Sequence, residues 1–503
     1  MQVSGGFLGK IFGSLTRATS EEKERTEREL PYAVMIFTLM AVSGISPYDC
    51  WKRMRKLSFL PVFRKEADEI VRQVEVLGKD FLTVMQNRAE STGSKLYRSF
   101  LGGFASSVRS GGKLVDYMKG QLKSLFELRH IEMNRSIERI ATLVEGYSVM
   151  LIVVLCGYIL LVVFASTNIM QLLTNTSISV TPVMSYLIAF LLMPLMTGIF
   201  ILIAHNMQKS SFPNLKDLYK KALFFIAPAF ALIGIFALVP SVSEALKPVG
   251  LPEITTIALV AASLPTAIQY YRISKVSYNA EDLIPSFIVD ITESQKTGLS
   301  PEKSIIQATK RRGYGSFSKY LNLVQSQIMW GIPLRKTFEN IGKEIRSSFV
   351  IVNFSMMIET IEVGGNSIQS LEILSEYSEK EREIQIDRRA LLKPYIFLAL
   401  IWSVLIAVTT TIVALTTSMM TTLASSNLSA ATSVALGGQV NTFSVGIILQ
   451  CWVSGFFIGK ISEGNLGAGF KHAALLAATA YLSLVFSQIL LGGVFKIGIP
   501  GAT

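Results

Sequence analysis

Seven apolar stretches without a single Asp, Glu, Lys or Arg constrain this sequence more than any other feature. They cover residues 147–165, 183–204, 222–239, 254–271, 395–416, 442–459 and 473–492. Each is close to the ~20 apolar residues that cross the hydrocarbon core of a bilayer. Lipid offers the backbone no hydrogen-bond partners, so each stretch is expected to be helical. The sequence therefore predicts an all-α polytopic membrane protein with about seven transmembrane helices.

Charged residues concentrate in two other parts of the chain. Residues 1–146 hold 23 Lys and Arg and residues 272–393 hold 17, against 8 in all remaining positions. This alternation predicts five regions. They are an N-terminal amphipathic and charged segment (1–29), a first helical domain (30–146), four transmembrane helices (147–271), a second helical domain (272–393) and three transmembrane helices (394–503). We call residues 30–146 the first segment and residues 272–393 the second segment.

Loops between the apolar stretches alternate between basic and uncharged. Loops 166–182 and 417–441 carry no charge. The basic loops, 205–221 and 460–472, contain Lys209, Lys216, Lys220, Lys221, Lys460 and Lys471. Short loops rich in Lys and Arg stay in the cytoplasm. We therefore expect a multi-pass protein of the cell membrane, with both charged domains in the cytoplasm and the C-terminus outside.

A short pattern occurs twice, about 254 residues apart, and indicates an internal repeat. It runs from Leu30-Pro31 to Gly44-Ile45-Ser46-Pro47 and again from Ile284-Pro285 to Gly298-Leu299-Ser300-Pro301. Apolar residues recur at i, i+3, i+4 and i+7, which is typical of one buried helix face. The glycine fits a helix C-terminus, and Ser-Pro fits the start of the next helix. The pattern predicts the same helix–turn–helix corner in both segments, built on Gly44 and Pro47 and on Gly298 and Pro301.

A double glycine follows in each segment, at Gly111-Gly112 and at Gly364-Gly365. Each pair stands between two long helical patterns. Glycine tolerates the backbone conformations that tight turns require. We therefore expect each pair to form the turn of an antiparallel helix pair.

Two basic clusters lie at corresponding places, shortly after the two Ser-Pro pairs. They consist of Lys52, Arg53, Arg55 and Lys56 in the first segment and of Lys310, Arg311 and Arg312 in the second. One interpretation is a solvated face or a face in contact with lipid headgroups. The other is a docking site for an acidic partner protein. Nucleic acid is disfavoured, because Trp51 is the only aromatic residue interleaved with them.

The sequence shows no pattern typical of an enzyme. It contains no GxxxxGK[ST] phosphate loop, no HExxH, no GxSxG and no Cys/His spacing that suits a metal. We therefore expect no catalytic residue, no cofactor and no metal ion. A transporter or channel with cytoplasmic regulatory domains is the alternative function. The apolar stretches, however, lack the ionisable residues that mark many transport pathways.

Parts of both segments resemble the type II secretion system F domain. The resemblance rests on the stretch from Glu29-Leu30-Pro31 to Pro47, on its second occurrence, and on Ile361–Ser367 followed by Leu371 and Tyr377. Gly365 stands where the family commonly has Glu, so a contact that depends on that Glu cannot be carried over.

The resemblance implies a non-enzymatic role in protein secretion or filament assembly. Family members are inner-membrane platform proteins of type IV pili, type II secretion systems and archaella. Four spans between the segments and three after them are similar to the larger archaeal members. The implied partners are a cytoplasmic hexameric secretion ATPase, pilin or archaellin subunits and membrane lipid. The seven residues of the basic clusters are our candidates for ATPase docking. The sequence leaves open archaellum or pilus, and monomer or homodimer.

Overall fold

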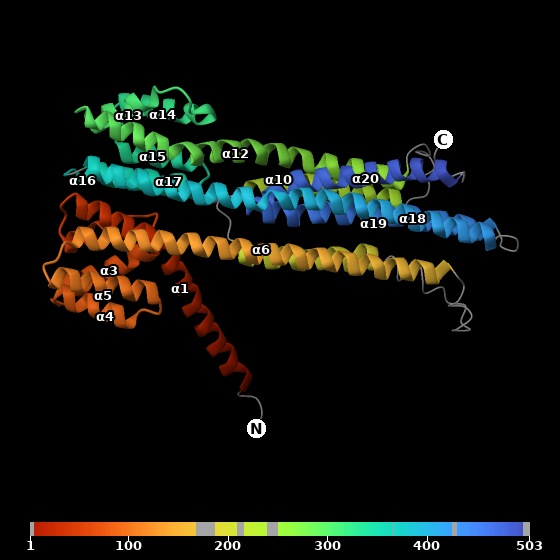
Figure 1. The fold of residues 1–503 in the computed structure, drawn as a ribbon, viewed down its shortest axis with the longest axis horizontal. Coiled ribbons are helices and arrows are strands. Elements are labelled where there is room, and N and C mark those ends of the chain that lie inside the picture. Colours follow the sequence, from red (N-terminus) through yellow and green to blue (C-terminus); the bar gives the residue numbers. More distant parts are fainter. Residues whose placement is uncertain are drawn as a thin grey trace. The chain divides into compact units, whose positions relative to one another are not determined.

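The structure, a computed structural model, describes residues 5–166, 187–208, 216–238, 250–365, 367–424 and 430–495 (Figure 1). Every regular element in these ranges is a helix, which confirms the predicted all-α class. Of the two uncharged loops, 166–182 falls outside the described residues except for Ser166. The predicted loop 417–441 is wrong for most of its length, because the helix before it continues to Ala424 and the helix after it begins at Ala430. The chain forms two compact units: unit 1 comprises Met1–Met133 and Val276–Gln385, and unit 2 comprises Asn134–Lys275 and Ile386–Thr503.

Unit 1 contains two series of helices, one from each segment. The first series is α1 (Gly5–Val42), α2 (Pro47–Met54), α3 (Pro61–Glu75), α4 (Phe81–Ser91), α5 (Lys95–Arg109) and the first part of α6 (Leu114–Ser166). The second is the last part of α12 (Leu251–Lys296), α13 (Pro301–Thr309), the short turn η2 (Gly315–Phe317), α14 (Ser318–Met329), α15 (Leu334–Glu344), α16 (Ser348–Val363) and most of α17 (Ser367–Leu392).

The corner after the first helix of each series has the same geometry. Two residues after the ends of α1 and α12 stand glycines with φ of 84° and 87°, a conformation that favours glycine. A serine then accepts a backbone N–H as the N-cap of the next helix, and proline takes the first helical position. These residues are Gly44, Ser46 and Pro47 in the first segment and Gly298, Ser300 and Pro301 in the second.

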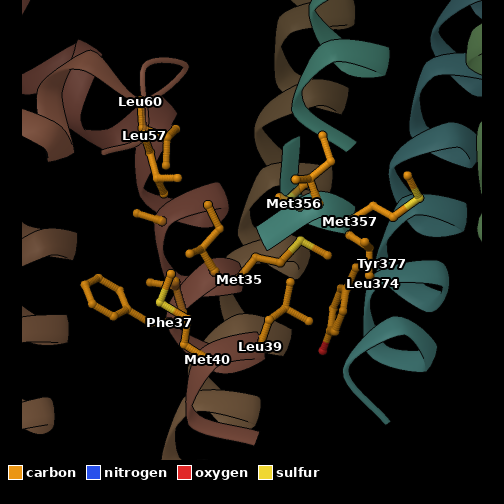
Figure 2. Packing of buried hydrophobic residues seen from close by; sticks show 14 of the residues in the cluster. Met35, Phe37, Leu39, Met40, Leu57, Leu60, Met356, Met357, Leu374 and Tyr377 are labelled. Atoms are coloured by element: carbon orange, nitrogen blue, oxygen red, sulfur yellow. The ribbon is translucent and has the colours of Figure 1, made fainter. Parts of the chain in front are cut away.

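Both segments share one hydrophobic core. The predicted apolar faces of the two first helices lie in it, each residue at most 1% exposed: Leu30, Ala33, Val34 and Phe37, and Ile284, Phe287, Ile288 and Ile291. Met35 and Leu39 of α1 point toward Met357, Leu374 and Tyr377 of α16 and α17 (Figure 2). Burying one large apolar side chain contributes roughly 1.5–3 kcal/mol, so this packing is a major source of stability.

Unit 2 contains the membrane-type helices. Besides the remaining parts of α6, α12 and α17, it comprises η1 (Ile188–Leu192), α9 (Met193–Met207), α10 (Lys216–Leu238), α18 (Pro394–Ala424), α19 (Ala430–Glu463), η3 (Leu466–Ala468) and α20 (Gly469–Phe495). Among the described residues, seven helices are long and apolar enough to cross a membrane, the number predicted. α6 and α12 are unbroken over 53 and 46 residues, and Pro265 does not interrupt α12 (Figure 1).

Small residues bring α19 and α20 into close contact. Gly455 and Gly459 lie four residues apart on α19, where a side chain would overlap the backbone of Ala473 and Gly469. Membrane helices approach closely at such small-xxx-small patterns, because lipid tails give them no hydrophobic drive to associate. Polar groups add cross-links: the Gln450 side-chain amide donates to Thr197 of α9 at 2.7 Å.

Lys460 lies inside α19 and is only 1% exposed, although the sequence analysis assigned it to a loop. Its ammonium donates to the carbonyls of Gln208 and Gly464, both at 2.7 Å. Those carbonyls follow the ends of α9 and α19, so one cation compensates two helix C-termini. Tyr219 also donates to Asn465 at 2.9 Å. The basic loops 205–221 and 460–472 therefore meet, as two loops on one side of a membrane can.

We expect Gly455→Ala to destabilise unit 2 by about 1–3 kcal/mol, because the new methyl group must push α20 away from α19. Gly198→Ala is the matched control, since a Cβ at that helical position meets nothing within 4 Å. It should be neutral or stabilising by up to about 1 kcal/mol. Thermal unfolding of the purified protein in detergent measures both. Equal midpoints for the two variants would contradict the packing described.

Candidate functional site

The turn between α16 and α17 fastens the two segments together. Gly365 has φ of 62°, and a side chain there would overlap the Ser43 carbonyl oxygen next to the first corner. The Ser43 and Ser370 hydroxyls lie 3.1 Å apart. Ser370 also donates to the Leu39 carbonyl at 3.1 Å. A Glu at position 365 could not fit this contact.

The same turn region also contacts the second corner. The Ser367 hydroxyl donates to the Gln295 amide oxygen at 3.3 Å, and Lys296 pairs with Glu372 at 2.8 Å. The corresponding turn of the first segment is different. Gly111 has φ of 63°, but the turn is exposed, with exposed Arg109 before it. The two double-glycine turns therefore have different surroundings.

A buried ion pair joins the segments a second time. The Arg129 guanidinium on α6 donates to Glu381 on α17 at 3.0 Å and to the Tyr32 hydroxyl at 2.8 Å. Glu381 is only 3% exposed, so its charge depends on this partner. Burial raises the pKa of the Tyr32 hydroxyl to about 12, although the Arg129 charge lowers it in part.

One polar contact is made twice, in equivalent places. The Ser94 hydroxyl, at the N-cap of α5, donates to Glu27 of α1 at 2.9 Å. The Ser347 hydroxyl, at the N-cap of α16, donates to Glu281 of α12 at 2.6 Å. The sequence analysis missed both pairs. Comparing polar residues at the same offsets of 254 and 253 as the glycines could have found them.

The basic cluster of the first segment lies at the end of α2, and part of it is already paired. Lys52 pairs with Glu75 at 2.8 Å and Arg55 with Asp68 at 2.6 Å. These partners are about half exposed, so each pair contributes little to stability. Arg53 is half-buried and Lys56 is exposed. The cluster is thus a surface feature available to a partner.

In the basic cluster of the second segment, one residue forms an ion pair within the fold and the other two are exposed on the surface. Arg311 pairs with Asp290 of α12, which is only 7% exposed and also accepts the Tyr314 hydroxyl. Burial raises the pKa of that hydroxyl to about 12, while Arg311 lowers it in part. Lys310 and Arg312 are exposed. Arg311 therefore belongs to the fold, and its two neighbours are better docking candidates.

The first basic cluster lies at the end of α2 and the second at the end of α13, so each is a site on its own segment. Within the described residues, no three His, Cys, Asp or Glu side chains come close enough to hold a metal ion. The arrangement offers charge and apolar surface for binding.

Comparison with known proteins identifies relatives. The sequence model of type II secretion system protein F matches residues 34–164 and 287–414, more than half of the chain. Each matched range begins in the first helix of a segment and ends in the following membrane-type helix. An uncharacterized protein of Methanocaldococcus jannaschii is 22% identical over 493 residues, which cover 93% of this chain and 81% of that protein. No solved structure matches the sequence.

Gly365→Ala should destabilise unit 1 by about 2–4 kcal/mol, through the positive φ and the overlap with Ser43. Gly111→Ala is the control, because it has nearly the same φ and open space around it. That variant should lose only about 1 kcal/mol. Thermal unfolding reports both, and a Gly365→Ala loss no larger than the control would mean that the turn contact is absent.

Arg129→Met should cost about 3 kcal/mol, because it leaves the Glu381 carboxylate buried without a cation. The double variant Arg129→Met/Glu381→Met should recover most of that loss, since it removes the unpaired charge as well. A double-mutant cycle on unfolding midpoints measures the coupling. Simple additivity of the two substitutions would show that the residues do not depend on each other.

Proposed function

Because the chain belongs to the type II secretion system protein F family, we propose that it is a membrane platform protein for filament assembly. The filament would be an archaeal type IV pilus or an archaellum. The family match across both segments and their adjoining membrane-type helices is the observation that carries the proposal. A non-enzymatic role accords with the binding surfaces described above.

An archaeal filament is supported by two features. The relative from the archaeon Methanocaldococcus jannaschii matches along 93% of this chain, including both segments and the helices between them. Seven membrane-type helices also accompany the two F-like segments, four between and three after. This number and order of membrane helices is what the resemblance leads us to expect in the platform proteins of archaella and archaeal pili.

The proposed partner on the cytoplasmic side is a hexameric secretion ATPase. Both segments share one core, so a force applied to either acts on unit 1 as a whole. α6 and α12 continue without a break from residues of unit 1 into residues of unit 2. In this proposal the two helices carry movement to the membrane-type helices, where pilin or archaellin subunits leave the lipid. The meeting of the two basic loops supports placing unit 1 in the cytoplasm.

We further propose that the segments arose by internal duplication. The two helix series have the same order, and the Ser94–Glu27 and Ser347–Glu281 contacts recur at the same offsets. A recurring polar contact is stronger support than recurring apolar residues, because hydrophobic positions converge easily in any helix bundle.

The double variant Lys310→Glu/Arg312→Glu tests the ATPase partnership. It leaves Arg311 in place, because Glu at that position would face the buried Asp290 carboxylate. We expect co-purification with the ATPase to fall by roughly tenfold or more, with loss of surface filaments in electron micrographs. The control Lys303→Glu/Lys319→Glu changes the charge equally at exposed positions of the same segment. Normal ATPase binding and filaments in the first variant would refute this docking site.

A further inference from the structure

Four apolar side chains stand out on the surface of unit 1. Among its large hydrophobic residues with described side chains, only four are more than half exposed. They are Val76 at 75%, Leu77 at 59%, Met329 at 68% and Trp330 at 80%. Each such side chain lacks the roughly 1.5–3 kcal/mol of stabilisation that its burial would contribute. Adjacent large apolar residues with this degree of exposure are candidates for a surface that a partner covers.

The four residues form two equivalent pairs. Val76-Leu77 follows α3 directly before Gly78, and Met329-Trp330 ends α14 directly before Gly331. The glycines have φ of 62° and 75°. We call the pairs the first tip and the second tip. Glycine and backbone hydrogen bonds close both helix ends, so turn formation itself does not require apolar side chains here.

Each tip adjoins the basic cluster of its own segment. Glu75, next to Val76, binds Lys52 at 2.8 Å. In the second segment the Gln325 side-chain amide nitrogen lies 3.9 Å from the Met329 sulfur. The amide oxygen of Gln325 accepts a hydrogen bond from the hydroxyl of Thr309, next to Lys310, at 3.4 Å. Both segments thus present an apolar tip beside basic side chains. This combination matches interface hot spots, where Trp, Met and Arg are enriched.

We propose that the two tips are twin docking points for one oligomeric protein whose subunits each present an apolar pocket rimmed by carboxylates. This inference rests on the proposed function and specifies how the ATPase is held. The basic residues beside each tip supply the charge complementarity. Two equivalent tips on one chain match a partner that repeats the same pocket in successive subunits.

The shared core makes this arrangement effective. Both tips belong to a single compact unit, so the second contact follows the first without ordering a flexible linker. Such bivalent binding exceeds either single contact by about 10²–10⁴-fold in apparent affinity. Loss of one tip should therefore remove most of the avidity, and loss of both should abolish binding.

The test uses the full-length protein in detergent and the purified hexameric secretion ATPase of the same organism. We compare Val76→Ser/Leu77→Ser, Met329→Ser/Trp330→Ser and the combination of all four. Each pair should weaken binding by about 10²-fold or more, and the fourfold variant should leave none. Because these side chains are exposed, the unfolding midpoint should not change. Ile131→Ser, at a residue 46% exposed outside the tips, is the control.

The remaining outcomes separate this inference from the proposed function. Wild-type-like ATPase binding by the fourfold variant would overturn the docking tips and leave the platform function standing. The docking tips would equally be overturned if the substitutions abolished binding to vesicles of anionic phospholipid and spared the ATPase, because lipid would then cover the tips. Absence of any ATPase binding by the wild-type protein would overturn both proposals.

Discussion

The close contact between the first corner and the α16–α17 turn is the constraint on which unit 1 depends. Gly365 admits the Ser43 carbonyl because it carries no side chain, and Ser370 completes the contact through its hydroxyl. With the turn in this position, Met35 and Leu39 reach Met357 and the residues of α17. Without it, Met35 and Leu39 of α1 would lack the residues that pack against them.

Buried charges in this protein follow the same principle in unit 1 and in unit 2. Glu381 is neutralised by Arg129 across the two segments, and Asp290 by Arg311 within one. Lys460 is held by two helix C-terminal carbonyls. In each case a partner comes from another element or from a helix end, so each charge also fixes how elements meet. None of these groups is left as a free reactive charge.

The sequence was sufficient for features that depend on local composition. The seven membrane-type helices followed from apolar length, and the corners from Gly, Ser and Pro at fixed spacing. The shared core did not follow, because periodicity shows that a helix face is apolar without showing what covers it. Arg311 was grouped with its neighbours because its partner Asp290 lies on another helix. Lys460 was placed in a loop because a charge ended the apolar stretch, although α19 continues to Glu463.

The difference between the two double-glycine turns explains why copies of this chain need not link to one another through the corner and the turn. A surface and its complement on one chain would link copies head to tail if both stayed available. Here the α16–α17 turn of the same molecule covers the first corner. The turn of the first segment differs at the position that corresponds to Ser370. Tyr117 stands there and donates to the Phe100 carbonyl at 3.1 Å. The contact between the first corner and the α16–α17 turn is thus made within one molecule. Neither surface is then available to link copies of the chain head to tail.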